Sequence, residues 1–407
     1  MTGIFSRIAA LSLAAMMLAG VGAGVAAASP AAAATAASPA FLTWRFIYRG
    51  SDKAQFDTVT AVNQRDAWVA GDYAKNTTAL ILHWTGTNWH SVKVPDARGF
   101  LPWYSDESAR NDVWFVGYQN SAGGSTPRAI RWTGSGWKNQ PMPADAQGFL
   151  SLRVLSPTNA WLANILSCPA DSPPAQKCSS LLWHWNGTTW HQYELPVGIS
   201  SVAGSSARNV WLSAYKGDGG KLNALRMHFY AYRWTGSAWH SVRMPHPLSV
   251  GCMPEIDTTS AHNVWVTTCG QRKGKDGLVL HWTGRRWQEH WNLTGSAPLI
   301  DGKVGVWLDP TIRWTAEGVG YAGLPIQGAS MSFPSVTRVP GTTTLLAVGE
   351  TWTNPARQRT YMAIVGGRFG PYRPAASDGE TAKPDASHPA AGPTLVAAVR
   401  PGALSRW

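Results

Sequence analysis

The sequence is poor in charged residues and lacks the hydrophobic period of helices. Asp, Glu, Lys and Arg make up only 14% of the 407 residues, and no segment between Phe41 and Tyr372 combines a helical period with capping residues. A Gly-x-Ser-x-Gly elbow, a His-Glu-x-x-His site and a Gly-x4-Gly-Lys loop are also missing. These absences exclude a helical fold, an α/β-hydrolase, a zincin and a P-loop nucleotide-binding protein.

Cysteine is scarce, and none occurs before Cys168. The four cysteines, Cys168, Cys178, Cys252 and Cys269, are an even number at short separations, which favours disulfides in an exported protein. We expect the pairs Cys168–Cys178 and Cys252–Cys269, because each closes a local loop. Four free thiols are the alternative.

The two ends of the chain differ in composition from its middle. Residues 1–34 place Arg7 before a long run of Ala, Leu and Met that ends in small residues, which is the pattern of a secretory signal peptide. An uncleaved membrane anchor is the alternative. Residues 374–407 open with a stretch poor in apolar residues that can pack, which predicts a disordered, low-complexity tail. We therefore expect an exported, soluble chain, not inserted in a membrane after cleavage, whose folded part is residues 41–373.

Two short signatures alternate along this folded part. One is centred on a tryptophan, as in RDAWVAGDY and NDVWFVGYQ, and its copies at Trp68, Trp114, Trp161, Trp211 and Trp265 are spaced by 46, 47, 50 and 54 residues. The other follows it, as in HWTGTNWHSVKVP, and its copies begin at His83, Arg131, His184, Arg233 and His281. Intervals of this size are typical of β-propeller blades and of helical repeats.

Each repeat reads as four short strands. In the first repeat the segments FDTVTAV, AWVAGDY, ALILHW and NWHSVKVP are rich in Val, Ile, Trp and Tyr and are separated by turn residues. Four antiparallel strands repeated along the chain predict an all-β fold, a β-propeller, because radial packing of blades buries both faces of each sheet.

The repeat leaves two possible numbers of blades, seven and six. Trp307 and Leu346 continue the spacing at intervals of 42 and 39 residues, which gives seven blades, with six as the alternative. The segment TWRFIYRG from Thr43 resembles a lone fourth strand. We expect it to complete the last blade and so to close the ring.

The repeated glycines, tryptophans and histidines are explained by the fold. The glycine of W-T/N-G-x-x-W supplies the positive φ of a tight hairpin. Flanking tryptophans such as Trp84 and Trp89 are expected to pack between blades, each burying about 150 to 250 Å². Histidines such as His83 and His90 keep constant places in the repeat. We therefore expect no metal site and no cofactor.

The blades resemble the tryptophan-rich secreted propellers of actinobacteria, in which DVWxVG is followed by HWxGxxW, and more distantly the Asp-box (BNR) and kelch groups. Two departures separate the sequence from those two groups. Trp84 stands where an Asp-box has aspartate, and Gly71 and Gly117 stand alone where kelch units have two glycines. The resemblance implies a fold and no particular activity.

Three carboxylates are candidates for acid and base chemistry. Glu255 and Asp257 lie two residues apart on the expected first strand of the fifth blade, hence on one face. Asp106 holds a comparable place in the second blade, beside Trp103 and Tyr104. Inner strands line the central channel of a propeller, and paired carboxylates beside aromatic rings are what glycoside hydrolysis requires. Solvated channel residues are the alternative interpretation.

A second candidate site lies in the loops between second and third strands. These loops, at residues 72–79, 118–128, 166–180, 215–228, 270–277 and 350–360, carry 11 basic and five acidic residues, and their lengths vary. The candidate binding residues in them are Tyr73, Lys75, Tyr118, Arg128, Tyr215, Lys216, Lys221, Arg272, Lys273, Lys275, Glu350, Arg357 and Arg359. Scattered solubilising charge is the alternative interpretation.

The net charge of +12 implies attraction to polyanions. Because the chain is expected to be exported, we predict an extracellular polysaccharide or an anionic cell-wall polymer as its partner, and no nucleic acid. The predicted protein is a secreted, extracellular or cell-wall-associated, monomeric binding module. A glycoside hydrolase or lyase acting on polysaccharide and an extracellular protein-interaction platform are the alternatives.

Overall fold

The computed structural model describes residues 42–49, 54–73, 78–143, 146, 148–164, 180–217, 227–244, 248–250, 252–272, 275–293, 295, 298–301, 305–315, 318–323, 330–354 and 357–365. The chain divides into two compact units, Met1–Ser38 and Pro39–Trp407, and every described residue belongs to the second. The expected signal peptide, the tail and the pair Cys168–Cys178 lie outside the described residues.

The first four blades follow one another along the chain, each with four antiparallel strands. Blade 1 comprises β3 (Ala54–Asn63), β4 (Asp66–Tyr73), β5 (Thr78–Trp84) and β6 (Trp89–Val92). Blade 2 comprises β7 (Phe100–Ala109), β8 (Asp112–Ser121), β9 (Gly124–Trp132) and β10 (Trp137–Gln140). Blade 3 comprises β11 (Phe149–Ser156), β12 (Asn159–Asn164), β13 (Ser180–Trp185) and β14 (Trp190–Leu195). Blade 4 comprises β15 (Gly198–Ser206), β16 (Asn209–Gly217), β17 (Met227–Trp234) and β18 (Trp239–Val242).

The remaining three blades include one strand from the start of the chain. Blade 5 comprises β20 (Glu255–Ser260), β21 (Asn263–Arg272), β22 (Lys275–Trp282) and β23 (Trp287–Trp291), and β19 (Ser249–Val250) joins it to blade 4 by pairing with β17 and β21. Blade 6 comprises β24 (Leu299–Asp301), β25 (Gly305–Asp309), β26 (Ile312–Thr315) and β27 (Gly318–Gly323). Blade 7 comprises β28 (Ser330–Arg338), β29 (Leu345–Asn354), β30 (Arg357–Val365) and β2 (Arg45–Arg49).

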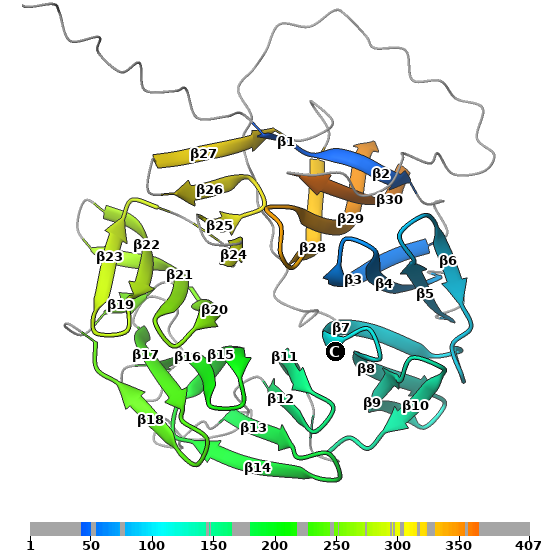
Figure 1. Ribbon diagram of the computed structural model, residues 1–407, viewed down its shortest axis with the longest axis horizontal. Coiled ribbons are helices and arrows are strands. Elements are labelled where there is room, and N and C mark those ends of the chain that lie inside the picture. The colour runs from blue at the N-terminus through cyan, green and yellow to red at the C-terminus, as the bar shows by residue number, and fades with distance from the viewer. Residues whose placement is uncertain are drawn as a thin grey trace, which may run out of the picture. The chain divides into compact units, whose positions relative to one another are not determined.

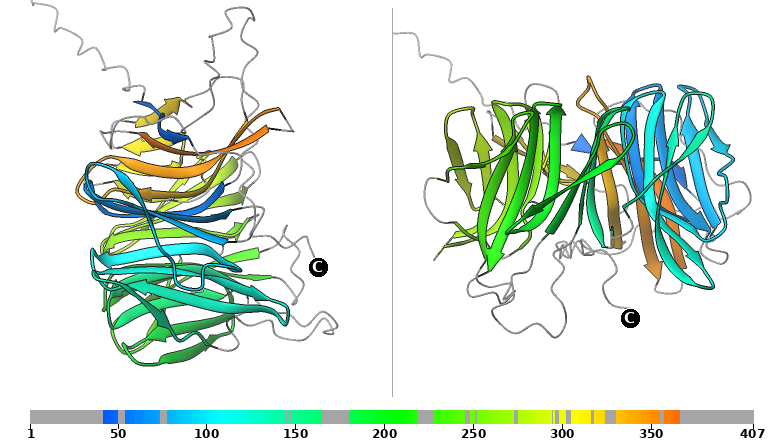
Figure 2. Two further views of the ribbon diagram at one scale, coloured as in Figure 1. Left: turned by 90° about the vertical axis from the view of Figure 1, so that its right-hand side faces the viewer. Right: turned by 90° about the horizontal axis from the view of Figure 1, so that it is seen from below.

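The first strands of the blades form a closed circle around the axis. Each first strand contacts the next, from β3 through β7, β11, β15, β20 and β24 to β28, and β28 contacts β3 again. Figure 1 looks down this axis, and Figure 2 shows the same sheets from the side. The predicted seven-bladed β-propeller is confirmed, and the six-bladed alternative is wrong.

Ring closure joins the two ends of the folded part. β2 pairs antiparallel with β30, with Phe46 opposite Ala363, as predicted for the segment from Thr43. The preceding strand β1 (Leu42–Thr43) was not predicted and pairs parallel with β27 of blade 6. Between them, Trp44 is fully buried and donates its indole N–H to the carbonyl of Pro310 at 2.5 Å. This N-terminal arm therefore fastens blade 6 to blade 7.

The tight turns between third and fourth strands need glycine for two reasons. Gly86, Gly134, Gly187, Gly236 and Gly284 all have positive φ, between 92° and 109°, which confirms the prediction. In addition, a Cβ atom at Gly187 would approach Thr158 of the neighbouring hairpin to 2.7 Å. The missing side chain makes room for the turn between the first and second strands of the same blade.

Tryptophans fill the spaces between blades, as predicted. The ring of Trp68 on β4 lies 5.4 Å from that of Trp132 and 5.7 Å from that of Trp137, both in blade 2. The same arrangement recurs between Trp114 and the pair Trp185 and Trp190, between Trp161 and the pair Trp234 and Trp239, and between Trp211 and the pair Trp282 and Trp287. In blades 1 to 4, the second-strand tryptophan thus packs on two tryptophans of the following blade, whereas Trp265 of blade 5 packs on Trp314 alone at 5.0 Å.

In blades 1, 2, 4 and 5 a polar side chain accepts the indole N–H of the second-strand tryptophan, whereas in blade 3 the indole N–H of Trp161 has no partner among the described residues. The indole N–H of Trp68 donates to Asp66 at 3.1 Å, and His83 Nε2 lies 2.9 Å from the same carboxylate. The His83 ring stacks on the indole at a centroid distance of 3.7 Å. We call this arrangement of Asp or Asn, Trp, and His or Arg the indole clamp. A hydrogen bond of this kind contributes about 0.5 to 1.5 kcal/mol.

The other blades use the clamp with substitutions. In blade 5, Asn263 accepts from Trp265 at 2.9 Å and contacts His281 at 2.9 Å. In blade 2, Arg131 replaces the histidine and forms an ion pair of 2.6 Å with the buried Asp112. Burial lowers the pKa of His281 to about 4, so this imidazole is neutral at pH 7. The prediction that these histidines belong to the repeat is confirmed.

Blades 6 and 7 depart from this pattern. In blade 6, Gly305 stands where the clamp has Asp or Asn, and Asp301 on β24 binds Arg313 instead, at 2.6 and 3.1 Å. A side chain at position 305 would lie 3.0 Å from atoms of both Asp301 and Arg313. In blade 7, Leu346 replaces the tryptophan and packs in one cluster with Trp84. This is why the repeat fades in the sequence while the fold continues.

The expected disulfide between Cys252 and Cys269 is present, with the two Cα atoms 5.3 Å apart. It fastens the segment before β20 to β21 of the same blade. In the described part of the chain, no helix is long and apolar enough to cross a bilayer.

Candidate functional site

The two faces of the ring are built from different connections. In each antiparallel blade, the turn from the first to the second strand and the turn from the third to the fourth lie at the same end. We call this end of the ring the hairpin face. The opposite end carries the second-to-third loops and the linkers between blades, and we call it the loop face.

A cavity of about 340 Å³ lies where the first strands end, at the hairpin face of the channel. Its lining comes from the first strands of all seven blades and, with Pro340, from a residue that follows one of them: Val62, Asp106, Glu107, Ser108, Arg153, Val154, Leu155, Ser205, Asp257, Leu299, Thr337, Arg338 and Pro340. Three carboxyl groups and two guanidinium groups therefore meet in one cavity.

Asp106 and Arg153 form one charged pair in this cavity. Arg153 Nη1 on β11 lies 3.4 Å from Asp106 Oδ1 on β7, and the backbone N–H of Val154 donates to Asp106 at 2.5 Å. Burial raises the pKa of Asp106, and Arg153 opposes that rise. The pair joins blades 2 and 3.

Asp257 and Arg338 form the second pair. Arg338 Nη1 on β28 donates to Asp257 Oδ2 on β20 at 3.0 Å and to the carbonyl of Ile300 at 3.3 Å. Asp257 also accepts the backbone N–H groups of Ile300 and Thr258, each at 2.8 Å. Arg338 thus reaches across the short β24 and connects blade 7 with blade 5.

Glu107 is the third carboxyl group and has a different environment. Strand alternation would direct it away from Asp106, but a β-bulge at the end of β7 lets both residues line the cavity. Its Oε2 atom is buried and has no hydrogen-bond partner among the described residues. Burial, together with the nearby Asp106, raises the pKa of Glu107 well above its usual range. This environment favours the protonated form of Glu107.

Glu255, the remaining candidate carboxylate, is separate from this cavity. It lies two residues before Asp257 on β20, further from the hairpin face, and is not among the lining residues. Burial raises its pKa to about 8, although a hydrogen bond with Ser201 partly opposes the rise. Burial likewise raises the pKa of Tyr104 to about 12, with a contribution from Glu255. Asp106 and Asp257 thus share a cavity, whereas Glu255 lies deeper in the channel.

The cavity can bind groups that offer both hydrogen-bond donors and acceptors. Asp106 and Asp257 are acceptors, Arg153 and Arg338 are donors, and a protonated Glu107 can be either. Vicinal hydroxyl groups of a sugar have this mixed character. Within the described ranges, no group of three or more His, Cys, Asp or Glu residues is arranged to hold a metal ion.

Several candidate residues of the loop face are committed to the fold. Arg128 donates to the carbonyls of Asp96 and Pro95 at 2.7 and 2.8 Å and to Gln119 at 2.6 Å. Tyr118 is buried, and its hydroxyl accepts the N–H of Gly148 at 2.7 Å. Tyr215 and Glu350 are also buried, with exposed fractions of 1% and 8%. These four side chains are therefore not part of a binding surface on the loop face.

The other candidates of the loop face divide into two groups. The side chains of Tyr73 and Lys216 are exposed. Lys75, Lys221 and Lys273 lie outside the described residues, and so do the side chains of Arg272, Lys275, Arg357 and Arg359, whose backbones belong to β21, β22 and β30. The large hydrophobic side chains that the described residues expose are Tyr73 and Met253, on blade 1 and just before blade 5. They form no contiguous apolar patch of the kind that a protein-interaction platform requires.

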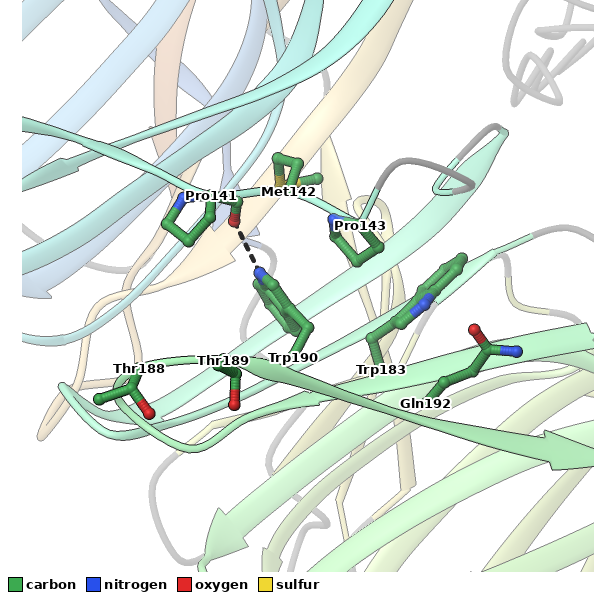
Figure 3. A pocket seen from close by; sticks show the side chains of 8 residues that line it. All are labelled: Pro141, Met142, Pro143, Trp183, Thr188, Thr189, Trp190 and Gln192. Atoms are coloured by element: carbon green, nitrogen blue, oxygen red, sulfur yellow. Dashed lines mark hydrogen bonds between the residues drawn. The ribbon is translucent and has the colours of Figure 1, made fainter.

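A second cavity, of about 310 Å³, lies on the outer side of blades 2 and 3 (Figure 3). The linker Pro141, Met142 and Pro143 forms one wall, and β13 and β14 form the other with Trp183, Trp190 and Gln192. Trp190 donates its indole N–H to the Pro141 carbonyl at 2.7 Å. Trp137 makes the equivalent bond to Lys93 at 2.9 Å. This bond belongs to the packing of adjacent blades, and the cavity is the space beside it.

Three lining residues of the channel cavity were missed in the sequence. Arg153 and Arg338 come from blades far apart in the chain, so their meeting with aspartates depends on ring closure. Glu107 was missed because the alternation rule fails at a bulge. A useful signal exists for Arg153, which holds the register position in blade 3 that Asp106 holds in blade 2.

The comparisons with known proteins concern the fold only. No family model matches the sequence, and no curated protein matches it significantly. Three solved structures share the fold: the polysaccharide lyase Uly1 (TM-score 0.51, 8% identity, 78% of this chain and 98% of that chain), YCF48 bound to a D1 peptide (0.50, 12%, 79% and 96%) and the acylaminoacyl peptidase of Pyrococcus horikoshii (0.51, 10%, 76% and 52%). At these identities the similarity shows a β-propeller and nothing about activity.

Proposed function

We propose that this propeller is a glycan-binding module whose binding pocket is the channel cavity at the hairpin face. One observation carries the proposal: Asp106, Arg153, Asp257 and Arg338, from four different blades, converge on a single cavity. Charged groups that are held by each other and by backbone N–H groups form a preorganised hydrogen-bonding lining, which suits a polyhydroxylated ligand. That a polysaccharide lyase shares this fold is compatible with the proposal.

The place of action that we propose is extracellular. The disulfide Cys252–Cys269 favours an oxidising compartment, and residues 1–34 have the pattern of a signal peptide. An extracellular or cell-wall polysaccharide is therefore the partner class, and the proposed working unit is a monomer.

The test is binding of the purified protein to an array of neutral and acidic glycans, with Arg338→Gln as the variant. We expect this variant to lose at least tenfold in affinity, because Asp257 then turns from a shared partner into an uncompensated acceptor. The matched control is Arg98→Gln, an exposed arginine of the loop face, which should bind as the wild type does. Equal binding by all three proteins would exclude the channel cavity as the site.

Glu107 favours cleavage of polysaccharide as a second candidate function. A protonated carboxyl group beside other carboxylates is the arrangement of general acid and base in glycoside hydrolysis. Reducing ends released from the glycan in the same assay, and absent with Glu107→Gln, would establish turnover. Retention of the glycan with no released product assigns binding alone.

A further inference from the structure

The charged residues at the two faces of the ring are arranged differently. On the hairpin face, five arginines are exposed in the described turns: Arg65, Arg110, Arg208, Arg285 and Arg286. They belong to blades 1, 2, 4 and 5, and all lie in turns of the hairpin face, the face near which the channel cavity lies. Arg110 is 81% exposed, and its Nε lies 3.7 Å from Asp66.

The carboxylates near this face are withdrawn from solvent. Asp66 is held by His83 and Trp68, Asp112 by Arg131, and Asp301 by Arg313, and their exposed fractions are 3%, 0% and 0%. No exposed carboxylate occurs in the described turns of the hairpin face. Among the described residues of the loop face, by comparison, the exposed Lys93, Arg98 and Arg243 are accompanied by the exposed Asp96 and Glu194.

The repeat itself positions two of the arginines. The aliphatic stem of Arg65 packs over Gly86. Its Cβ and Cγ atoms lie 3.1 and 3.2 Å from the position that a Cβ atom at residue 86 would occupy. Arg208 packs over Gly236 in the same way, with its Cγ atom at 3.0 Å. The turn glycines hold the aliphatic stems, and the guanidinium groups are left on the surface. Two exposed cations are thus held on the hairpin face, over the outer turns of their blades, with less conformational entropy to lose on binding.

From this arrangement we infer that the glycan is acidic and that the hairpin face, rather than the loop face, binds it. The inference rests on the proposed glycan binding and specifies its ligand class as a polysaccharide with carboxylate groups on successive sugars. Arginine forms paired hydrogen bonds with a carboxylate. Cations on four blades of one face match an extended polymer that crosses the ring, while one sugar occupies the channel cavity.

The test compares polygalacturonate with the same polymer after full methyl esterification, which removes its charge. We expect the wild type to bind polygalacturonate at least tenfold more tightly than the ester, and to lose at least tenfold in affinity between about 30 and about 300 mM NaCl, because screening shortens the reach of exposed charges. Equal affinity for the two polymers, or affinity independent of salt, overturns the inference. Tighter binding of polyphosphate or dextran sulfate than of polygalacturonate overturns the choice of carboxylate.

Two matched triple variants locate the surface. Arg65→Gln/Arg208→Gln/Arg286→Gln removes three charges from the hairpin face and should weaken binding at least tenfold. Lys93→Gln/Arg98→Gln/Arg243→Gln removes three from the loop face and should change it less than twofold. An equal loss in both, or a larger loss in the second, overturns the assignment. Salt dependence of the wild type tests the acidic ligand even if one variant does not fold.

The outcomes also separate this inference from the proposed function. Binding of a neutral glycan that depends on Arg338, without preference for polygalacturonate, keeps the proposed function and removes the inference. Binding of no glycan at all removes both.

Discussion

In every blade, one residue of the first strand pairs with one residue of the second strand at the same place in the repeat. This position is variable on the first strand and nearly constant on the second. On the second strand the row of these positions reads Trp68, Trp114, Trp161, Trp211, Trp265, Trp307 and Leu346. Their partners on the first strand are Thr60, Asp106, Arg153, Ala203, Asp257, Leu299 and Thr337. One strand repeats a single residue type in six of seven blades, while its neighbour carries small, acidic, basic and apolar residues.

This contrast shows where the fold leaves freedom for function. The tryptophans fill the space between adjacent blades and are mostly fully buried, so most replacements would leave a void. Five of the seven first-strand residues line the channel cavity: Asp106, Arg153, Asp257, Leu299 and Thr337. Variation is concentrated at the surface where the blades converge, and this is also where the charged cavity lies.

The largest effect is expected from removing a repeated tryptophan. Trp114→Ala should lower the free energy of unfolding by about 3 to 5 kcal/mol, because it opens a cavity between blades 2 and 3. The control is Thr337→Ala, in the variable row of the first strand, which should cost less than about 1 kcal/mol. Urea denaturation measures both. Similar losses for the two variants would contradict the division between the strands.

The next effect concerns the disulfide, which lies away from the channel cavity. Cys252→Ala/Cys269→Ala should lower the free energy of unfolding by about 3 kcal/mol, the loop-closure value for cysteines separated by 17 residues. Glycan affinity measured at low temperature should stay within twofold of the wild type. If the variant is still folded but has lost affinity, the loop-face end of blade 5 belongs to the binding site.

The next effect depends on pH and arises from Glu255. Its pKa is raised from 4.5 to about 8 in the folded protein, so folding favours the protonated form. Its contribution to stability is complete below pH 4.5 and is lost as pH rises toward 8, by up to ~1.4 kcal/mol per pH unit. Glu255→Gln should remove this slope. Thermal unfolding from pH 4 to 8 should show the variant gaining stability over the wild type with rising pH, and parallel curves would contradict the buried carboxyl group.

The smallest effect is the difference in stability between variants of two turn glycines, one that belongs to the repeat and one that does not. Gly187→Ala should destabilise by about 1 to 2 kcal/mol, because its φ of 102° disfavours a side chain and Thr158 occupies the space. Gly136→Ala meets nothing within 4 Å and should be neutral or stabilising by up to about 1 kcal/mol. Calorimetric unfolding temperatures distinguish the two, and a lower value for Gly136→Ala would be the contrary result.

The fold could be predicted because the tryptophan and glycine positions report directly on blade packing and turns. Blade 6 was harder to recognise, since Asp301 replaces the missing residue at Gly305 from a different strand. The candidate site was only partly predictable. Asp106 and Asp257 were identified from strand alternation, but their arginine partners depend on contacts between blades.

The choice of face was also beyond a count of charges along the chain. The long variable loops favoured the loop face as the binding surface. There, however, Arg128 donates to a backbone carbonyl of a linker, and the Tyr118 hydroxyl accepts a backbone N–H. The hairpin turns are short and regular, and their arginines stand out only when each carboxylate nearby is seen to be paired.

The N-terminal arm has a consequence for how the protein folds. Trp44 bonds to a carbonyl 266 residues further along the chain, and β2 pairs with the last described strand. The first residues of the ring therefore remain without partners until nearly the whole domain has been synthesised, and closure of so long a loop is slow. The ring cannot close one blade at a time during synthesis. Such a folding order is compatible with the extracellular location proposed above.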